Sequence, residues 1–165
     1  MFKILLFSLL AIVLFLTLLY TQFNLTNIER WVRWQYQDVP QLSTAELEAW
    51  LADNQRTAPQ LLDVRTRAEY DVSHISGAFR VSPNAEPAAV LQTVDANRPI
   101  VLYCAVGQRS SKLGEKLIAA GRKDVWNLEG SIFAWANEGK SLVRDGETVT
   151  EVHPVNRFYG LLLNN

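Results

Sequence analysis

The chain passes from a strand pattern to a helix pattern within residues 99–113, Pro99-Ile100-Val101-Leu102-Tyr103-Cys104-Ala105-Val106-Gly107-Gln108-Arg109-Ser110-Ser111-Lys112-Leu113. The apolar run from Ile100 to Tyr103 is short, rich in β-branched and aromatic residues and preceded by proline, which predicts a buried parallel strand. From Ser110 the apolar residues take helical spacing, and Gly121 is placed to end that helix in a left-handed conformation. Cys104, the only cysteine, therefore falls at the carboxyl end of a strand and just before a helix.

A strand, a tight loop containing glycine and a helix together form an anion-binding cradle, because backbone N–H groups and the positive end of the helix dipole face inward. A thiol in that position should have its pKa lowered from about 8.5 toward neutrality or below. Cys104 is therefore a candidate nucleophile. A lone cysteine is also commonly a buried structural residue, but the end-of-strand position, Gly107 and Arg109 favour the nucleophile.

Composition limits the classes of function. With 165 residues, 48% of them hydrophobic, the chain fits one domain and a short extra element. A formal charge of −1, from 16 basic and 17 acidic residues without a Lys/Arg run, argues against a nucleic-acid partner. One cysteine excludes an internal disulfide, and one cysteine with 2 histidines excludes the usual zinc sets. We therefore expect no metal.

Residues 4–23 contain no charged side chain. At about 1.5 Å per residue they are long enough to cross a hydrocarbon core of about 30 Å. The alternative, a cleaved signal peptide, usually has a shorter apolar region and a cleavage site that Tyr20-Thr21-Gln22-Phe23 does not offer. We therefore predict a retained single-pass membrane anchor. The charge pattern leaves its orientation open, with Lys3 before the span favouring a domain on the extracytoplasmic side.

Local motifs predict several further elements. Ser43-Thr-Ala-Glu46 and Thr66-Arg-Ala-Glu69 are capping boxes that start helices. Between them, Leu61-Leu62-Asp63-Val64 is typical of a core strand, and Asp145-Gly146 predicts a hairpin turn. Residues 26–38 interleave tryptophans with arginines, which fits either a helix at a membrane interface or an ordinary linker.

Four motifs resemble the rhodanese family of sulfurtransferases. Cys104-Ala-Val-Gly-Gln-Arg109-Ser110 is similar to the family's active-site loop, and three other segments agree in order and spacing: Leu61-Leu-Asp63-Val-Arg65-Thr-Arg-Ala-Glu69-Tyr70, His74-Ile-Ser-Gly77-Ala78 and Asn127-Leu-Glu-Gly130-Ser-Ile-Phe-Ala-Trp135. The resemblance covers approximately residues 42–142. It implies a single rhodanese-like α/β domain, with three layers and a central, mainly parallel sheet. Alternating strands and helices predict the same fold class.

The chain is thus expected to have four segments: a transmembrane anchor (1–23), a juxtamembrane linker (24–41), the rhodanese-like domain (42–142) and a C-terminal extension (143–165). The extension departs from the family pattern. Its apolar part, residues 155–163, is too short to span a bilayer. Packing on the domain, contact with the membrane and self-association are all compatible with it.

The resemblance implies a catalytic site at Cys104, whose thiolate attacks a sulfane sulfur and becomes a persulfide. Backbone amides of the following residues would bind the substrate and stabilise the persulfide anion, while Arg109 would attract an anionic donor; the residues are Ala105, Val106, Gly107, Gln108, Arg109 and Ser110. Asp63 and Arg65 end a strand, where open α/β sheets place ligand-contacting groups. The family implies that Asp63 braces the loop and that His74 lies on a turn away from the sulfur.

The implied partners are a small anionic sulfur donor such as thiosulfate and an acceptor such as cyanide or a thiol, including a protein thiol, with no cofactor. Two alternatives stay open. Cys-x₄-Arg followed by serine is also similar to the loop of cysteine phosphatases and arsenate reductase-like enzymes, although a phosphate-binding loop of seven residues is wider. The other alternative is a non-catalytic rhodanese-like binding module, against which the intact Cys104 and its loop argue.

Overall fold

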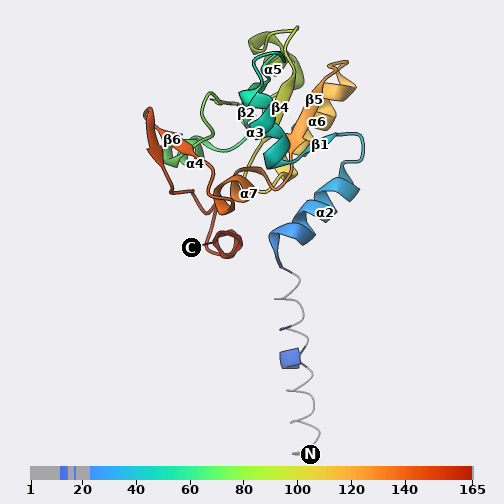
Figure 1. The fold of residues 1–165 in the computed structure, drawn as a ribbon. Coiled ribbons are helices and arrows are strands. Elements are labelled where there is room, and N and C mark those ends of the chain that lie inside the picture. The colour runs from blue at the N-terminus through green and yellow to red at the C-terminus, as the bar shows by residue number, and fades with distance from the viewer. Residues whose placement is uncertain (1–11, 15–16, 18–22, 165) are drawn as a thin grey trace, which may run out of the picture.

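The fold is built on a five-stranded sheet in which every neighbouring pair of strands is parallel, in the order β1-β5-β4-β2-β3 (Figure 1). The computed structural model describes residues 12–14, 17 and 23–164. The strands are β1 (Gln41–Leu42), β2 (Gln60–Asp63), β3 (Phe79–Arg80), β4 (Ile100–Tyr103) and β5 (Val125–Leu128). The predicted α/β fold with a central parallel sheet is confirmed, and β4 has the predicted bounds.

Alternate residues of β4 face opposite sides of the sheet and belong to two separate cores. The helices of the domain are α3 (Thr44–Ala52), α4 (Arg67–Val72), α5 (Pro87–Thr93), α6 (Gln108–Ala119) and α7 (Ser131–Asn137). Val101 and Tyr103 pack with α3 and α7, whereas Ile100 and Leu102 pack with α5 and α6. Because both faces are covered, β2 and β4 are buried along their whole length. The result is the three-layer arrangement that the family resemblance implies.

Local capping chemistry sets the ends of these helices. Both predicted capping boxes are present, one formed by Ser43 and Glu46 and one by Thr66 and Glu69. After α6, Gly121 takes a positive φ of 89°, as predicted for a helix stop. The start of α6 differs from the prediction, because the helix begins at Gln108 and not at Ser110. Gly107, with a φ of 99°, turns the chain into the helix two residues earlier.

Helix α2 (Leu25–Gln35) precedes the sheet and packs one side against the domain. Val32, together with Tyr36 and Val39 just after the helix, forms a small apolar cluster against which Ile118 of α6 packs. Trp31 and Trp34 are 42% and 67% exposed. The segment predicted as a linker thus contains a helix, while the contact of this helix with a membrane interface stays a prediction.

The predicted membrane span, residues 4–23, lies mostly outside the described residues. Within residues 12–14, 17 and 23–164, no helix combines the length and apolar character needed to cross a bilayer.

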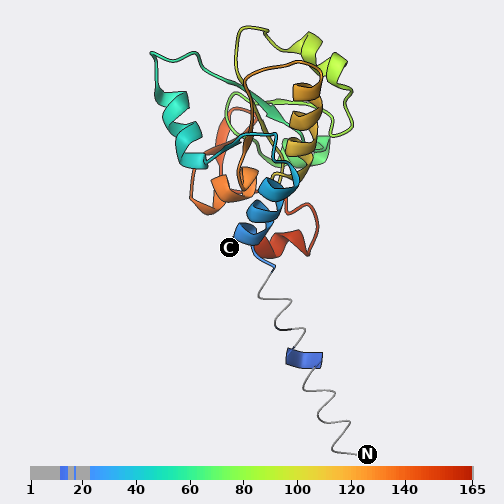
Figure 2. The same ribbon diagram turned by 90° about the vertical axis from the view of Figure 1, so that its right-hand side faces the viewer.

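The C-terminal extension folds back onto the domain. Strands β6 (Leu142–Arg144) and β7 (Glu147–Val149) form the predicted hairpin, with Asp145 and Gly146 at positive φ. The chain then ends in a short 3₁₀ helix, η1 (Tyr159–Leu162), whose Leu162 is buried in the core shared with α3 and α7. Figures 1 and 2 both show η1 close to the beginning of α2. Of the alternatives left open for residues 155–163, packing on the domain is therefore observed.

Candidate active site

Cys104 follows β4 directly and is only 1% exposed. The start of α7 holds its backbone in place: the N–H of Cys104 donates to Ser131 Oγ at 3.2 Å, and the N–H groups of Ile132 and Phe133 donate to the carbonyls of Cys104 and Ala105 at 3.2 and 3.1 Å. These bonds hold both the N–H and the carbonyl of Cys104 against the start of α7. The position of its sulfur is therefore fixed.

The loop after Cys104 turns back over the sulfur. The N–H of Gly107 donates to Sγ at 3.2 Å, which requires the chain to reverse within three residues. Gly107 is the residue that permits this turn, because its φ is 99° and a Cβ there would lie 3.2 Å from Asn127 Nδ2. Ser110, fully buried in the first turn of α6, carries a hydroxyl that can donate either to Sγ or to the Gly107 carbonyl 3.2 Å away.

These contacts stabilise the thiolate of Cys104. Burial alone would raise the pKa of this thiol, but the positive charge of Arg109 and hydrogen bonds from Ser110 and the N–H of Val106 outweigh burial and lower the pKa below its ordinary value. The Cys104 thiol therefore ionises at a lower pH than a free thiol, as expected of a nucleophilic cysteine.

Arg109 is itself fixed by a residue on another helix. Its Nη1 and Nη2 donate to the two carboxylate oxygens of Glu69 at 2.9 and 2.6 Å. Glu69 also accepts from the hydroxyl and N–H of Thr66, which it caps at the start of α4. Burial would raise the pKa of Glu69, but the hydrogen bonds from Arg109 and Thr66 lower it to about 2. The guanidinium is thus locked in place by a carboxylate that stays ionised.

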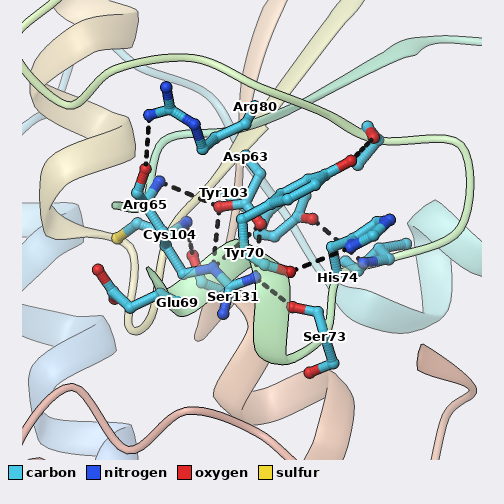
Figure 3. A network of polar contacts seen from close by, with 12 residues as sticks. Asp63, Arg65, Glu69, Tyr70, Ser73, His74, Arg80, Tyr103, Cys104 and Ser131 are labelled. Carbon is cyan, nitrogen blue, oxygen red and sulfur yellow. Dashed lines mark hydrogen bonds and ion pairs between the residues drawn. The ribbon is translucent and has the colours of Figure 1, made fainter. Parts of the chain in front are cut away.

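The predicted supporting residues Asp63 and Arg65 form a second ion pair (Figure 3). Arg65 donates to both carboxylate oxygens of Asp63, at 2.6 to 3.0 Å, and to the Ser73 carbonyl at 2.6 Å, with both charged side chains fully buried. This pair lies one residue before the Thr66 cap of α4. It therefore anchors the helix that carries Glu69. It also borders the residue before Cys104, because Asp63 lies opposite Tyr103 in the sheet and the Arg65 guanidinium is 5.9 Å from the Tyr103 ring centroid.

Other residues singled out in the sequence lie as follows. Ala105 and Val106 are buried, and Gln108 is exposed at the start of α6. His74 stacks on Tyr70 with ring centroids 3.9 Å apart. Figure 3 shows it across the polar network from Cys104, as the family resemblance implies. Among residues 12–14, 17 and 23–164, no group of three or more His, Cys, Asp or Glu side chains is placed to hold a metal ion.

A cavity of about 210 Å³ opens over the loop. It is lined by Cys104, Arg109 and their loop neighbours on one side and by Val155 and Tyr159 of the C-terminal extension on the other. A larger hollow of about 410 Å³ borders Val125, at the opposite end of the sheet from Cys104, and contains no cysteine. The smaller cavity is therefore the candidate active site.

Sequence patterns missed two parts of this site. Glu69 was identified as a helix cap, but its pairing with Arg109 joins residues 40 positions apart. Val155 and Tyr159 belong to an extension that departs from the family pattern, so no motif connected them with Cys104. Only the apolar character of residues 155–163 indicated that this segment is buried somewhere.

Comparisons with known proteins agree with this architecture. The family model described as "Rhodanese-like domain" matches residues 43–138. The chain is 34% identical over 98 residues to "Probable adenylyltransferase/sulfurtransferase MoeZ" of Mycobacterium tuberculosis. The aligned residues make up 59% of this chain but only 24% of the relative. It is 31% identical over 105 residues to a protein named "Sulfurtransferase" from Allochromatium vinosum, covering 64% of this chain and 95% of the relative.

The same relationship is seen among solved structures. The rhodanese-like domain protein of Staphylococcus aureus superposes with a TM-score of 0.56 at 32% identity, covering 65% of this chain and 99% of that one. The match of 43–138 spans four of the five strands, β2 to β5, together with the loop of Cys104 and the helices that hold it. From sequence, fold and active-site loop together, the chain belongs to the rhodanese-like domain family.

Proposed function

We propose that this protein is a membrane-anchored sulfurtransferase that carries a sulfane sulfur on Cys104. The donor is a small sulfur anion such as thiosulfate, and the acceptor is cyanide or a thiol, including a protein thiol. The observation that carries the proposal is the setting of Sγ: it accepts a hydrogen bond from Gly107, and Arg109 lowers its pKa. The relatives named as sulfurtransferases support the same reaction class.

In the first step the Cys104 thiolate attacks the outer sulfur of thiosulfate. A bond forms between Sγ and that sulfur, the sulfur–sulfur bond of thiosulfate breaks, and sulfite leaves with the bonding electron pair. The negative charge moves one atom outward, from Sγ to the terminal sulfur of the persulfide. Loop N–H groups and Arg109 stabilise that charge without rearrangement, because β4, α6 and α7 already fix their positions.

In the second step the acceptor attacks the terminal sulfur. The bond between the terminal sulfur and Sγ breaks, and Sγ leaves as a thiolate. With cyanide the product is thiocyanate, and with a thiolate it is a new persulfide. The low pKa of Cys104 helps this step as well, because a stabilised thiolate is a better leaving group. Both steps are displacements at sulfur, so the cycle as proposed uses no cofactor.

Sulfite release from thiosulfate in the presence of cyanide tests this function. The full-length protein in detergent should release sulfite and thiocyanate in equal amounts. A protein that binds thiosulfate but forms neither product would be a binding module, which would contradict the proposal.

The anchor, its single pass and an extracytoplasmic domain are part of the same proposal. Their support is the uncharged stretch of residues 4–23 and the position of Lys3 before it. Phe23, the last residue of that stretch, contacts Phe158 with ring centroids 4.0 Å apart. A membrane anchor would therefore join the domain beside the C-terminal extension, close to the active-site cavity.

A further inference from the structure

Residues 155–163 lie outside the matched family range, yet they are held firmly over the active-site loop. Asn137 of α7 clamps them from both directions, since its Nδ2 donates to the Leu162 carbonyl at 2.8 Å and its Oδ1 accepts from the Asn164 N–H at 2.7 Å. Leu162 is buried between these contacts. This segment is therefore a fixed wall of the cavity.

Tyr159 is supported from behind by a second aromatic residue. The ring of Phe23 lies edge-on to Tyr159 at a centroid distance of 6.2 Å and against Phe158 at 4.0 Å. The N–H of Tyr159 also donates to Asn156 Oδ1 at 3.0 Å. Side chain and backbone are both restrained, so Tyr159 presents a preformed aromatic surface to the cavity.

Val155 reaches the cavity with an unusual backbone. Its φ is 64°, a left-handed value that β-branched residues rarely adopt, and its N–H donates to His153 Nδ1 at 2.9 Å. Strained residues of this kind persist where the surroundings impose them, and they cluster at functional sites. The left-handed turn places a branched apolar side chain on the wall opposite Arg109.

The charges at the loop favour a donor with one negative charge over one with two. Of the lining residues, all within the described range 23–164, Arg109 alone is basic, and Glu69 already pairs with it. Arg109 and the loop N–H groups are occupied by the Cys104 thiolate, so the lining residues offer no second basic side chain for the additional charge of a dianion. Coulomb repulsion scales with the product of the charges, so a monoanion approaches at half the cost that a dianion such as thiosulfate meets.

The volume of the cavity also favours an organic donor over thiosulfate. A cavity of about 210 Å³ holds roughly seven waters at liquid density, which is more than a thiosulfate ion fills. The remaining volume borders Val155 and Tyr159, where an apolar group gains by burial and a charged group does not.

We propose that Val155 and Tyr159 are specificity-determining residues that bind the apolar body of an organic, monoanionic sulfur donor of the thiosulfonate class. This inference rests on the proposed sulfur transfer by Cys104. The Cys104 thiolate forms a bond to the terminal sulfur of the thiosulfonate, the sulfur–sulfonyl bond breaks, and the sulfinate leaves with the electron pair. The organic group stays against Val155 and Tyr159 while its sulfur reaches Sγ.

The test compares benzenethiosulfonate with thiosulfate as donors, using cyanide as acceptor and full-length protein in detergent. Wild type should have the higher kcat/KM with benzenethiosulfonate. Tyr159→Ala and Val155→Gly should each reduce the ratio of the two kcat/KM values about tenfold, the usual range for a lost apolar contact. Leu161→Ala is the matched control, because Leu161 lies on the same 3₁₀ helix, is 58% exposed and does not line the cavity. It should leave the ratio unchanged.

Val155→Gly separates this role from a structural one. Glycine tolerates the left-handed φ, which offsets the packing that Val155 loses against the core, so the melting temperature should change little while the donor ratio falls. A ratio that is unchanged in both variants, or that rises in favour of the aryl donor, overturns the inference. Calorimetry of benzenesulfinate binding to the Cys104→Ala protein tests, without turnover, whether Val155 and Tyr159 bind the apolar group. If Tyr159→Ala abolishes this binding and the wild-type protein transfers no sulfur from either donor, the binding site is sustained and the proposed function is refuted.

Discussion

Glu69 and Arg109 form a two-point ion pair, with Nη1 and Nη2 of the guanidinium 2.9 and 2.6 Å from the carboxylate oxygens. The pair joins the capped start of α4 to the helix that follows the nucleophile. Arg109 is therefore set in position before any substrate arrives. Glu69 acts on Cys104 only through Arg109, which makes it a positioning residue.

The Glu69 carboxylate should contribute a pH-dependent part of the protein's stability. Its pKa is lowered from 4.5 to about 2 by folding, so the stabilisation is fully present above pH 4.5 and is lost as pH falls toward 2. Glu69→Gln should lower the free energy of unfolding at pH 7 by roughly 3 kcal/mol, the equivalent of that shift. Urea unfolding at pH 7, 4 and 3 measures the difference, which should shrink with each step in pH.

Glu46→Gln provides the matched control for this experiment. Glu46 occupies the same capping-box position on α3, but it is exposed to solvent and no arginine pairs with it. Its substitution should therefore lower the free energy of unfolding much less than that of Glu69. Equal losses in the two variants would show that the Arg109 pair contributes no stability beyond that of a helix cap.

Arg109 should hold the thiol of Cys104 in its anionic form. Replacing it by methionine removes the largest of the favourable effects on this thiol, so the pKa of Cys104 should rise. Arg109→Lys keeps the charge and should give a smaller rise. With a single cysteine in the chain, thiolate absorbance near 240 nm against pH reports Cys104 alone. Identical titration curves in the methionine variant and wild type would remove Arg109 from this role.

Cys104→Ser should abolish sulfur transfer while the fold is retained. The hydroxyl fits the same buried space and accepts the hydrogen bond from Gly107, but it is neither anionic near pH 7 nor able to form a persulfide. Sulfite release should fall to background, and the melting temperature should change by only a few degrees. Appreciable turnover in the serine protein would exclude Cys104 as the sulfur carrier.

The parts of the fold that depend on neighbouring residues could be predicted from the sequence, and those that depend on distant ones could not. The apolar run of β4, two capping boxes and the Asp145-Gly146 turn act within a few residues, and each is found where expected. The Glu69–Arg109 pair and the wall formed by Tyr159 depend on how the chain folds back on itself. The start of α6 was predicted too late, because helical spacing marks apolar positions and not the φ of Gly107.

The membrane orientation is testable with a cysteine placed at Trp34, which is 67% exposed on α2. In a Cys104→Ser background the new thiol is the only one in the chain. If the domain is extracytoplasmic, a membrane-impermeant maleimide should label Trp34→Cys in intact spheroplasts of the expression host. Labelling that requires lysis would place the domain in the cytoplasm. Recovery of the protein in the soluble fraction without detergent would contradict the anchor itself.

Loop size should select sulfur over phosphorus as the atom that Cys104 attacks. The six residues from Cys104 to Arg109 close around one atom, since the N–H of Gly107 lies 3.2 Å from Sγ and α6 begins at the next residue. A phosphoryl group carries three oxygens that need donors at the same time, and a misplacement of about 1 Å can cost on the order of a hundredfold in rate. The wild-type protein should therefore transfer sulfur and leave aryl phosphates unhydrolysed.

One glycine inserted between Gly107 and Gln108 should widen the loop, depress sulfur transfer at least tenfold and admit a larger oxyanion such as arsenate. Kinetics of wild type on thiosulfate and on p-nitrophenyl phosphate decide the matter, because phosphatase turnover equal to or above sulfur transfer would identify a cysteine phosphatase on a rhodanese-like fold.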